Sequence, residues 1–173
     1  MPTLLSRILL AVMLICATPV LAQPRLEDMG IADLEAQAPE LHPAALYVLA
    51  GRLLAQGEGQ LAANWMYAGQ LRYRFLIEAG GGEDQRVLFS ALSEQVGRPV
   101  NEYIAGNVDE WLAAIDWALE WDASYPNATT SKTEHAEALV SVRAGLERLR
   151  AQIEAQRETI PAEREKNGLE NRM

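Results

Sequence analysis

The feature of this chain that most constrains its fold is the helical spacing of its apolar residues, interrupted by glycine and proline. From residue 30 to 158, apolar side chains recur three and four positions apart, and no segment alternates with period two. A period near 3.6 indicates amphipathic α-helices, whereas strands need period two. Pro43 fits the first turn of a helix, and Gly80-Gly81-Gly82 is a strong helix stop. The pattern predicts an all-α fold, a single-domain helical bundle of about five to six helices.

The helices that we expect differ in what they bury. Their ranges are 30–37, 43–56, 60–79, 83–96, 100–105, 109–123 and 133–158. The helix over 60–79 is apolar all round, which is typical of a central helix. The helix over 133–158 carries only a narrow seam and is predicted to lie on the outside of the bundle; the seam residues are Leu139, Val142, Leu146, Leu149 and Ile153. We therefore predict a helical domain over 23–160, followed by a loose charged tail over 161–173.

The first twenty-two residues have the layout of a cleavable secretory signal. A basic residue precedes an uninterrupted apolar run from Ile8 to Ala17, and small residues stand before a cleavage point after Ala22. The run is about ten residues, short of the ~20 that a spanning helix needs, so an uncleaved anchor is the less favoured alternative. Cys16 follows the large Ile15, which disfavours lipidation. The expectation is a periplasmic protein with no stable membrane anchor after cleavage.

Charge and cysteine content narrow the class of partner. Cys16 is the only cysteine and would leave with the signal, so the mature chain cannot form a disulfide. The chain has 15 basic and 24 acidic residues; loss of Arg7 leaves 14 and 24, a net charge of −10. Nucleic acid and anionic lipid both require an excess of Lys and Arg, so neither is expected. A basic protein partner is compatible with this charge, and simple solubility is the plain alternative.

Residues that carry chemistry are scarce. His42 and His135 lie far apart in the sequence, and the only lysines are Lys132 and Lys166. No zinc-protease, nucleophile-elbow or phosphate-loop motif is present. Metal sites and general-base sites usually need a histidine cluster or a histidine beside carboxylates. We expect no metal, no cofactor and no enzyme activity, although a hydrolase built on a pair of carboxylates stays open.

The helix over 109–123 carries the candidate partner-binding residues. Its core stripe occupies one face, a pair of tryptophans one turn apart lies roughly opposite with one carboxylate, and three further carboxylates line up on another face. These candidates are Trp117, Trp121, Glu110, Asp109, Asp116 and Glu120. Two interpretations are open. Another helix or loop covers the rings, or the rings and the acidic strip form an interface for a partner that supplies Arg or Lys.

Two arginines flank Tyr73 on the predicted central helix. A buried guanidinium is costly unless it is paired, so Arg72 and Arg74 should meet a carboxylate; the candidates are Asp84, Glu94 and Glu102. If either arginine points unpaired into a cleft, a pocket for an acidic ligand is favoured instead.

One stretch resembles a known helical hairpin. The segment LAGRLLAQG at 49–57, followed by AANWMYA at 62–68, resembles one unit of the tetratricopeptide or Sel1-like kind. The resemblance implies that Gly51 and Ala62 let two helices approach closely, with Leu54, Trp65 and Tyr67 filling the gap. It covers a single unit, whereas such arrays need about three. It therefore implies a hairpin and not a solenoid.

A second resemblance concerns function. The run WMYAGQLRYRF at 65–75, with GRPVNEY at 97–103, is similar to small exported helical proteins of Gram-negative bacteria. These include immunity partners of type VI secretion toxins, lipase effectors among the toxins. The resemblance implies a periplasmic protein that binds a toxin and blocks it, in a tight one-to-one complex. The alternative is an envelope adaptor or chaperone with a peptide-binding groove, which predicts weaker, broader binding and a concave surface.

Overall fold

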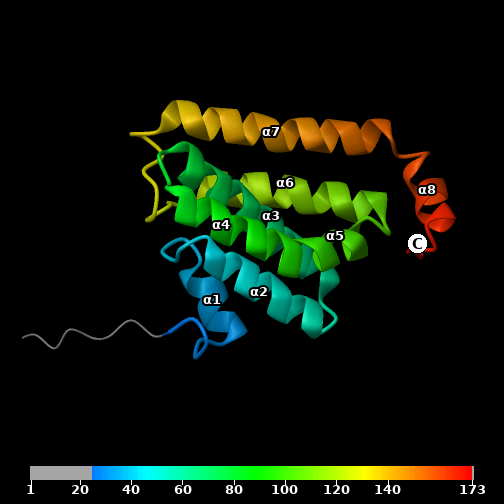
Figure 1. Ribbon diagram of the computed structural model, residues 1–173, viewed down its shortest axis with the longest axis horizontal. Helices are drawn as coiled ribbons and strands as arrows, with labels where there is room; N and C mark the ends of the chain where they lie inside the picture. The colour runs from blue at the N-terminus through cyan, green and yellow to red at the C-terminus, as the bar shows by residue number, and fades with distance from the viewer. Residues whose placement is uncertain (1–24, 173) are drawn as a thin grey trace, which may run out of the picture.

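Every regular element in the described part of the protein is helical. The structure is a computed structural model that describes residues 25–172, and these form a bundle without a strand (Figure 1). The prediction of an all-α fold is confirmed. The predicted signal segment 1–22 and its cleavage point after Ala22 lie outside the described residues.

The helices follow the order expected from the glycine and proline positions. They are α1 (Ile31–Gln37), α2 (Ala44–Ala55), α3 (Gly59–Glu78), α4 (Glu83–Leu92), a π-helical turn (Ser93–Gly97), α5 (Arg98–Ile104), α6 (Val108–Ser124), α7 (Ala136–Ala155) and α8 (Ile160–Lys166). Seven of the α-helices match expected ranges to within a few residues at most boundaries; α8 was not expected. Gly57 and Gly80, at φ 84° and 110°, adopt the left-handed conformation that ends α2 and α3.

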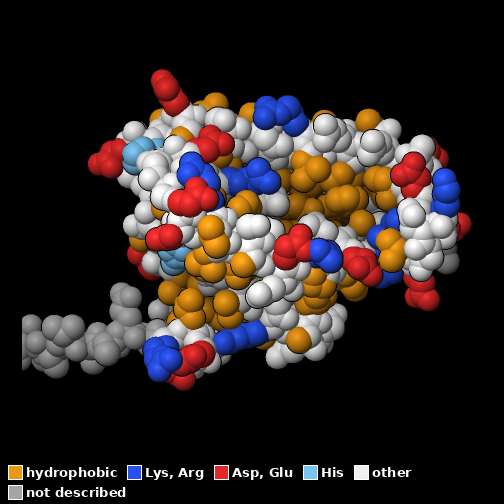
Figure 2. Space-filling view, viewed as in Figure 1, with side chains coloured by type: hydrophobic (Ala, Val, Ile, Leu, Met, Phe, Trp, Pro, Cys, Tyr) orange, Lys and Arg blue, Asp and Glu red, His pale blue; other side chains and the backbone are white. Residues whose placement is uncertain are grey.

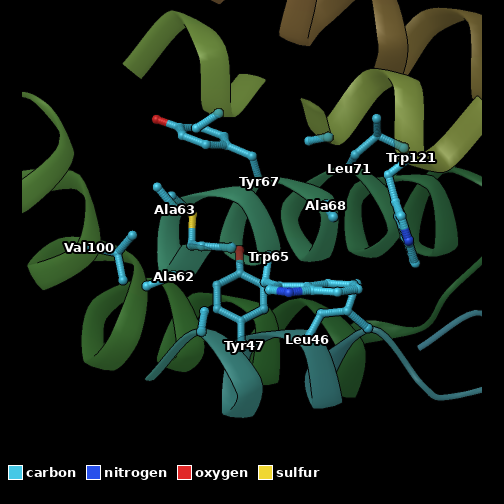
Figure 3. Packing of buried hydrophobic residues seen from close by; sticks show 14 of the residues in the cluster. Leu46, Tyr47, Ala62, Ala63, Trp65, Tyr67, Ala68, Leu71, Val100 and Trp121 are labelled. Carbon is cyan, nitrogen blue, oxygen red and sulfur yellow. The ribbon is translucent and has the colours of Figure 1, made fainter. Parts of the chain in front are cut away.

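The helix α3 is the centre of the bundle, as its all-round apolar pattern predicts. Most of its residues from Gly59 to Phe75 are buried, and α2, α5, α6 and α7 pack around it. Figure 3 shows its side chains between Leu46 and Tyr47 of α2 on one side and Trp121 of α6 on another. The long helix α7 lies along one side of the molecule and buries its seam at Val142, Leu146 and Ile153 (Figure 1).

The hairpin of α2 and α3 is present, but its close approach is not where the resemblance placed it. A Cβ at Gly69 would lie only 3.1 Å from side-chain atoms of Leu46 and Tyr47, so Gly69 is the contact glycine. Gly51 instead faces Val96 of the π-helical turn, whose nearest side-chain atom would lie 3.6 Å from an added Cβ. The expectation for Gly51 was wrong because its neighbour, Val96, comes from a helical turn later in the chain, whose position the local sequence does not determine.

The side chain of Tyr67 also points elsewhere than expected. Its hydroxyl donates to Oδ1 of Asn101 at 2.8 Å and accepts a hydrogen bond from the indole N–H of Trp111. It therefore links α3 to α5 and α6.

The C-terminal residues make defined contacts with the bundle, whereas we predicted a loose tail. Residues 160–166 form α8, and the Arg172 backbone N–H donates to the Gly106 carbonyl at 2.7 Å. The Arg172 guanidinium lies 3.6 Å from the ring centroid of Tyr103 and 2.6 Å from a Glu110 carboxylate oxygen. Ionic and backbone contacts hold this segment, and such contacts leave no apolar periodicity in the sequence from which they could be predicted.

Within residues 25–172, no helix combines the length and the apolar character needed to cross a membrane.

Candidate functional site

The predicted aromatic pair on α6 packs against α3. The rings of Trp117 and Trp121 are stacked, with centroids 6.1 Å apart, and the Trp65 ring of α3 meets both edge-on at 5.0 and 5.1 Å. Trp121 is only 8% exposed, and Trp117 is half-buried. Of the two interpretations, covered rings agree with this geometry. The interpretation as an exposed pair does not hold for Trp121, because Trp65 of α3 covers its ring.

The acidic strip beside these rings is used largely inside the protein. The carboxylate of Asp116 accepts two hydrogen bonds from Arg150 of α7, at 2.6 and 2.8 Å, and these bonds raise the pKa of Arg150. Asp109 pairs with Arg157, just beyond the end of α7, at 2.6 Å. The strip therefore fastens α7 to α6.

The remaining two candidates differ from each other. The carboxylate of Glu110 is paired with Arg172, as described above, and Glu120 is exposed without an ion pair among residues 25–172. Five of the six candidates thus make contacts within the chain, and the acidic strip stays largely at the surface, with the Asp109 side chain 82% exposed.

The buried arginine on α3 has a different partner from those expected. The Arg72 guanidinium is fully buried and lies 3.2 Å from Asp122 of α6, instead of pairing with Asp84, Glu94 or Glu102. It also donates to the carbonyl oxygens of Pro39 and Pro126, at 3.3 and 2.7 Å. Burial lowers the pKa of Arg72, and the Asp122 charge opposes this shift. The pair spans fifty positions, which local patterns do not encode.

Three cations converge on the Asp122 carboxylate, and together with it they form what we call the Asp122 cluster. Besides Arg72, they are Arg143 at 3.3 Å and Lys132 at 3.5 Å. Lys132 also donates to the Tyr125 carbonyl at 2.9 Å, near the C-terminus of α6. Cations are favoured there because free carbonyls carry the negative end of the helix dipole. The cluster fixes the loop between α6 and α7.

The second arginine of the predicted pair, Arg74, lies on the surface. Its side chain is exposed and makes no ion pair among residues 25–172, and its guanidinium lies 5.6 Å from the Phe89 ring centroid. It lines a cavity of about 320 Å³ between α3 and α7. This is the condition under which an acidic ligand was favoured over an internal ion pair.

We call this cavity the α3–α7 groove. Its floor is apolar and consists of Leu71, Val142, Leu146 and Leu149, and its charged rim consists of Arg74, Glu78 and Arg148. Figure 2 shows an apolar hollow beneath α7, with basic side chains beside it. Arg148, like Arg74, has no ion pair within the described residues. A partly apolar concavity with a few charged groups is the usual form of a binding site.

One wall of the groove carries a glycine inside a helix. Gly145 lies in the middle of α7 and lines the groove. An added Cβ there would meet only the tip of Arg148, at 3.7 Å, which is an ordinary contact. The apolar spacing predicts the α7 seam correctly, but it does not predict this groove, because the two walls of the groove are far apart in the chain.

Both histidines lie at the starts of helices. The Nδ1 atom of His42 accepts a hydrogen bond from the Ala44 N–H at 3.2 Å, at the start of α2, and His135 is the N-cap residue of α7. Over residues 25–172, no group of three or more His, Cys, Asp or Glu side chains is placed to hold a metal ion.

Comparison of the chain with protein-family models, curated proteins and solved structures gave no significant match, so the groove itself is the basis for a functional proposal.

Proposed function

We propose that this protein binds another protein and takes an apolar segment of it into the α3–α7 groove, as an envelope adaptor or chaperone does. The observation that carries the proposal is the groove. Its floor of four aliphatic side chains lies beside two arginines, Arg74 and Arg148, that make no ion pair within the described residues. The compartment that goes with this proposal is the periplasm, which the first twenty-two residues predict.

The concave shape supports the adaptor form of the proposal. Binding sites that take an extended or helical segment are grooves that combine an apolar floor with a few orienting charges. The α3–α7 groove has this form. The Asp116–Arg150 pair joins α7 to α6, and the Asp122 cluster joins α6 to Arg72 of α3 and to Arg143 of α7. A rigid wall favours recognition because little ordering is needed on binding.

The inhibitor hypothesis, an immunity protein that blocks a secreted toxin or lipase effector, stays a prediction. It rests on the resemblance of residues 65–75 and 97–103. Its candidate interface included the acidic strip of α6, and two of the three carboxylates of that strip, Asp116 and Asp109, pair with Arg150 and Arg157 of this chain. The two forms differ in a measurable way: an inhibitor holds one effector in a tight one-to-one complex, whereas an adaptor binds several segments weakly.

The test is a comparison of two immobilised proteins in periplasmic extract of the native host. Wild-type protein is run beside a Gly145→Leu variant, whose added side chain projects into the groove. A partner retained by the wild type and lost by the folded variant supports the proposal. A partner retained equally by both places the interface elsewhere, and no partner for either protein removes the proposal.

A further inference from the structure

We infer that the segment bound in the α3–α7 groove is an amphipathic helix that carries carboxylates beside its apolar face. The inference rests on the proposed function and specifies the chemistry of the partner. The bound helix presents aliphatic side chains to Leu71, Leu146 and Leu149 and places Asp or Glu near Arg74 and Arg148. This is the helix-in-groove mode of recognition, in which a few apolar anchors on one face of a helix provide the contact.

The glycine on the α7 wall indicates a helical occupant. A glycine inside a helix costs about 1 kcal/mol relative to alanine, so its presence needs a reason in packing or function. At Gly69 the reason is internal, because a Cβ would lie 3.1 Å from Leu46 and Tyr47. At Gly145 the nearest atom, in Arg148, lies at 3.7 Å, so nothing in the described chain requires the missing side chain. A glycine lets another backbone approach closely, and on a groove wall it would admit the backbone of a second helix.

The charges at the rim select the sign of the partner. The charged residues that line the groove are Arg74, Arg148 and Glu78. A guanidinium nitrogen of Arg148 would lie 3.7 Å from a Cβ at Gly145, and the Arg74 guanidinium lies 5.6 Å from the Phe89 ring centroid. No ion pair joins Glu78 to either arginine. The local balance is therefore positive on a protein whose net charge is −9. Guanidinium groups bind carboxylates through two hydrogen bonds, which favours Asp or Glu at these points of the bound helix.

The experiment uses two fluorescent synthetic peptides of about 18 residues, long enough to form an isolated helix. Both present a leucine face; one carries glutamates beside it and the other lysines. Their binding to the full mature protein is measured by fluorescence anisotropy. Wild type is compared with Gly145→Leu, with the double variant Arg74→Glu, Arg148→Glu, and with a control double variant, Arg25→Glu, Lys166→Glu.

The control changes the net charge by the same amount at exposed positions outside the groove lining. We expect the wild type to prefer the glutamate peptide, the double reversal to lower its affinity about tenfold and to raise that of the lysine peptide, and the control to change either by less than about twofold. Gly145→Leu should weaken both peptides at least tenfold, with a melting temperature no lower than that of the wild type, because leucine is the better helix former.

The outcomes separate this inference from the proposed function. Equal binding of the two peptides, or a double reversal that behaves like the control, overturns the preference for carboxylates. Unchanged binding to Gly145→Leu overturns the groove as the site. If neither peptide binds although the wild type retains a groove-dependent partner from extract, the helical occupant is wrong and the proposed function stands. If no peptide and no partner binds, both fail.

Discussion

The Asp122 cluster should be the most sensitive point of the fold to a change of one charge. Asp122→Asn keeps the size of the side chain and removes the negative charge that faces three cations. Both Asp122 and Arg72 are fully buried, at 0% side-chain exposure, so the guanidinium is left without compensation. Breaking a buried pair in this way costs about 3–5 kcal/mol of unfolding free energy. This is a large part of the total, which is about 5–15 kcal/mol for a domain.

Urea unfolding followed by circular dichroism measures the cost. For a chain of this size the slope is about 2 kcal/mol per molar urea, so the midpoint should fall by about 2 M. The matched control is Asp116→Asn, which removes the same charge from the partly exposed pair with Arg150. Surface pairs contribute about 0–1 kcal/mol, so the control should shift the midpoint by less than about 0.5 M.

A double-mutant cycle then tests the physical reason. Combining Asp122→Asn with Arg72→Met should cost less than the sum of the two single changes by about 1–3 kcal/mol, because the remaining cations Lys132 and Arg143 are partly exposed and can be hydrated. Additive effects, or a cost for Asp122→Asn as small as that of Asp116→Asn, would refute the idea that the buried charge balance holds the loop.

Three further predictions concern other contacts, each measured by urea unfolding. Trp121→Ala should cost about 3–5 kcal/mol because the ring is buried against α3, and Trp117→Ala about half of that. Burial raises the pKa of Tyr47 to about 12 from an ordinary 10.0; because the folded-state pKa is the higher one, this contribution to stability is complete below pH 10 and is lost as pH rises towards 12. The Tyr47 hydroxyl has no hydrogen-bond partner among the described residues, so Tyr47→Phe should leave stability at neutral pH unchanged or slightly higher and should reduce the alkaline loss of stability. Tyr67→Phe gives up two hydrogen bonds and should cost about 1–3 kcal/mol. A larger cost for Tyr47→Phe than for Tyr67→Phe would contradict this. Arg172→Ala should cost about 1 kcal/mol and make α8 cleave faster in limited trypsin digestion, and an unchanged digestion rate would show that the segment is held by other contacts.

Local patterns predicted the helices well because helix ends are local events. The Gly80-Gly81-Gly82 stop begins two positions after the end of α3, and the spacing of Val142, Leu146 and Ile153 identifies the buried seam of α7. The α6 helix shows the boundary of this reasoning. The sequence shows a second apolar face on this helix, and Trp121 on that face could be either covered or exposed. The position of Trp65, which packs on the Trp121 ring, decides that it is covered.

Contacts between distant charges were beyond the sequence. Nothing near Arg72 in the chain singles out Asp122 among 24 acidic residues, because the pairing follows from how α3 and α6 cross. The ordered C-terminal segment was missed for the same reason, since Arg172 is held by Glu110 and Tyr103 without any apolar stripe. The α3–α7 groove likewise exists only once lining residues more than sixty positions apart, such as Glu78 and Ser141, are side by side.

The packing of Trp65, Trp117 and Trp121 gives the protein an optical signal of its own. Three of its four tryptophans lie with ring centroids 5.0–6.1 Å apart, close enough for their excited states to couple, and the Arg72 guanidinium lies 4.2 Å from the Trp121 centroid. The far-ultraviolet circular dichroism of the folded protein should therefore contain an exciton component from Trp65 with Trp117 and Trp121, which vanishes when α3 and α6 separate. The lining of the α3–α7 groove does not include these rings. In one sample, the tryptophan signal can therefore report on the packing of α3 against α6 while a labelled peptide reports on binding.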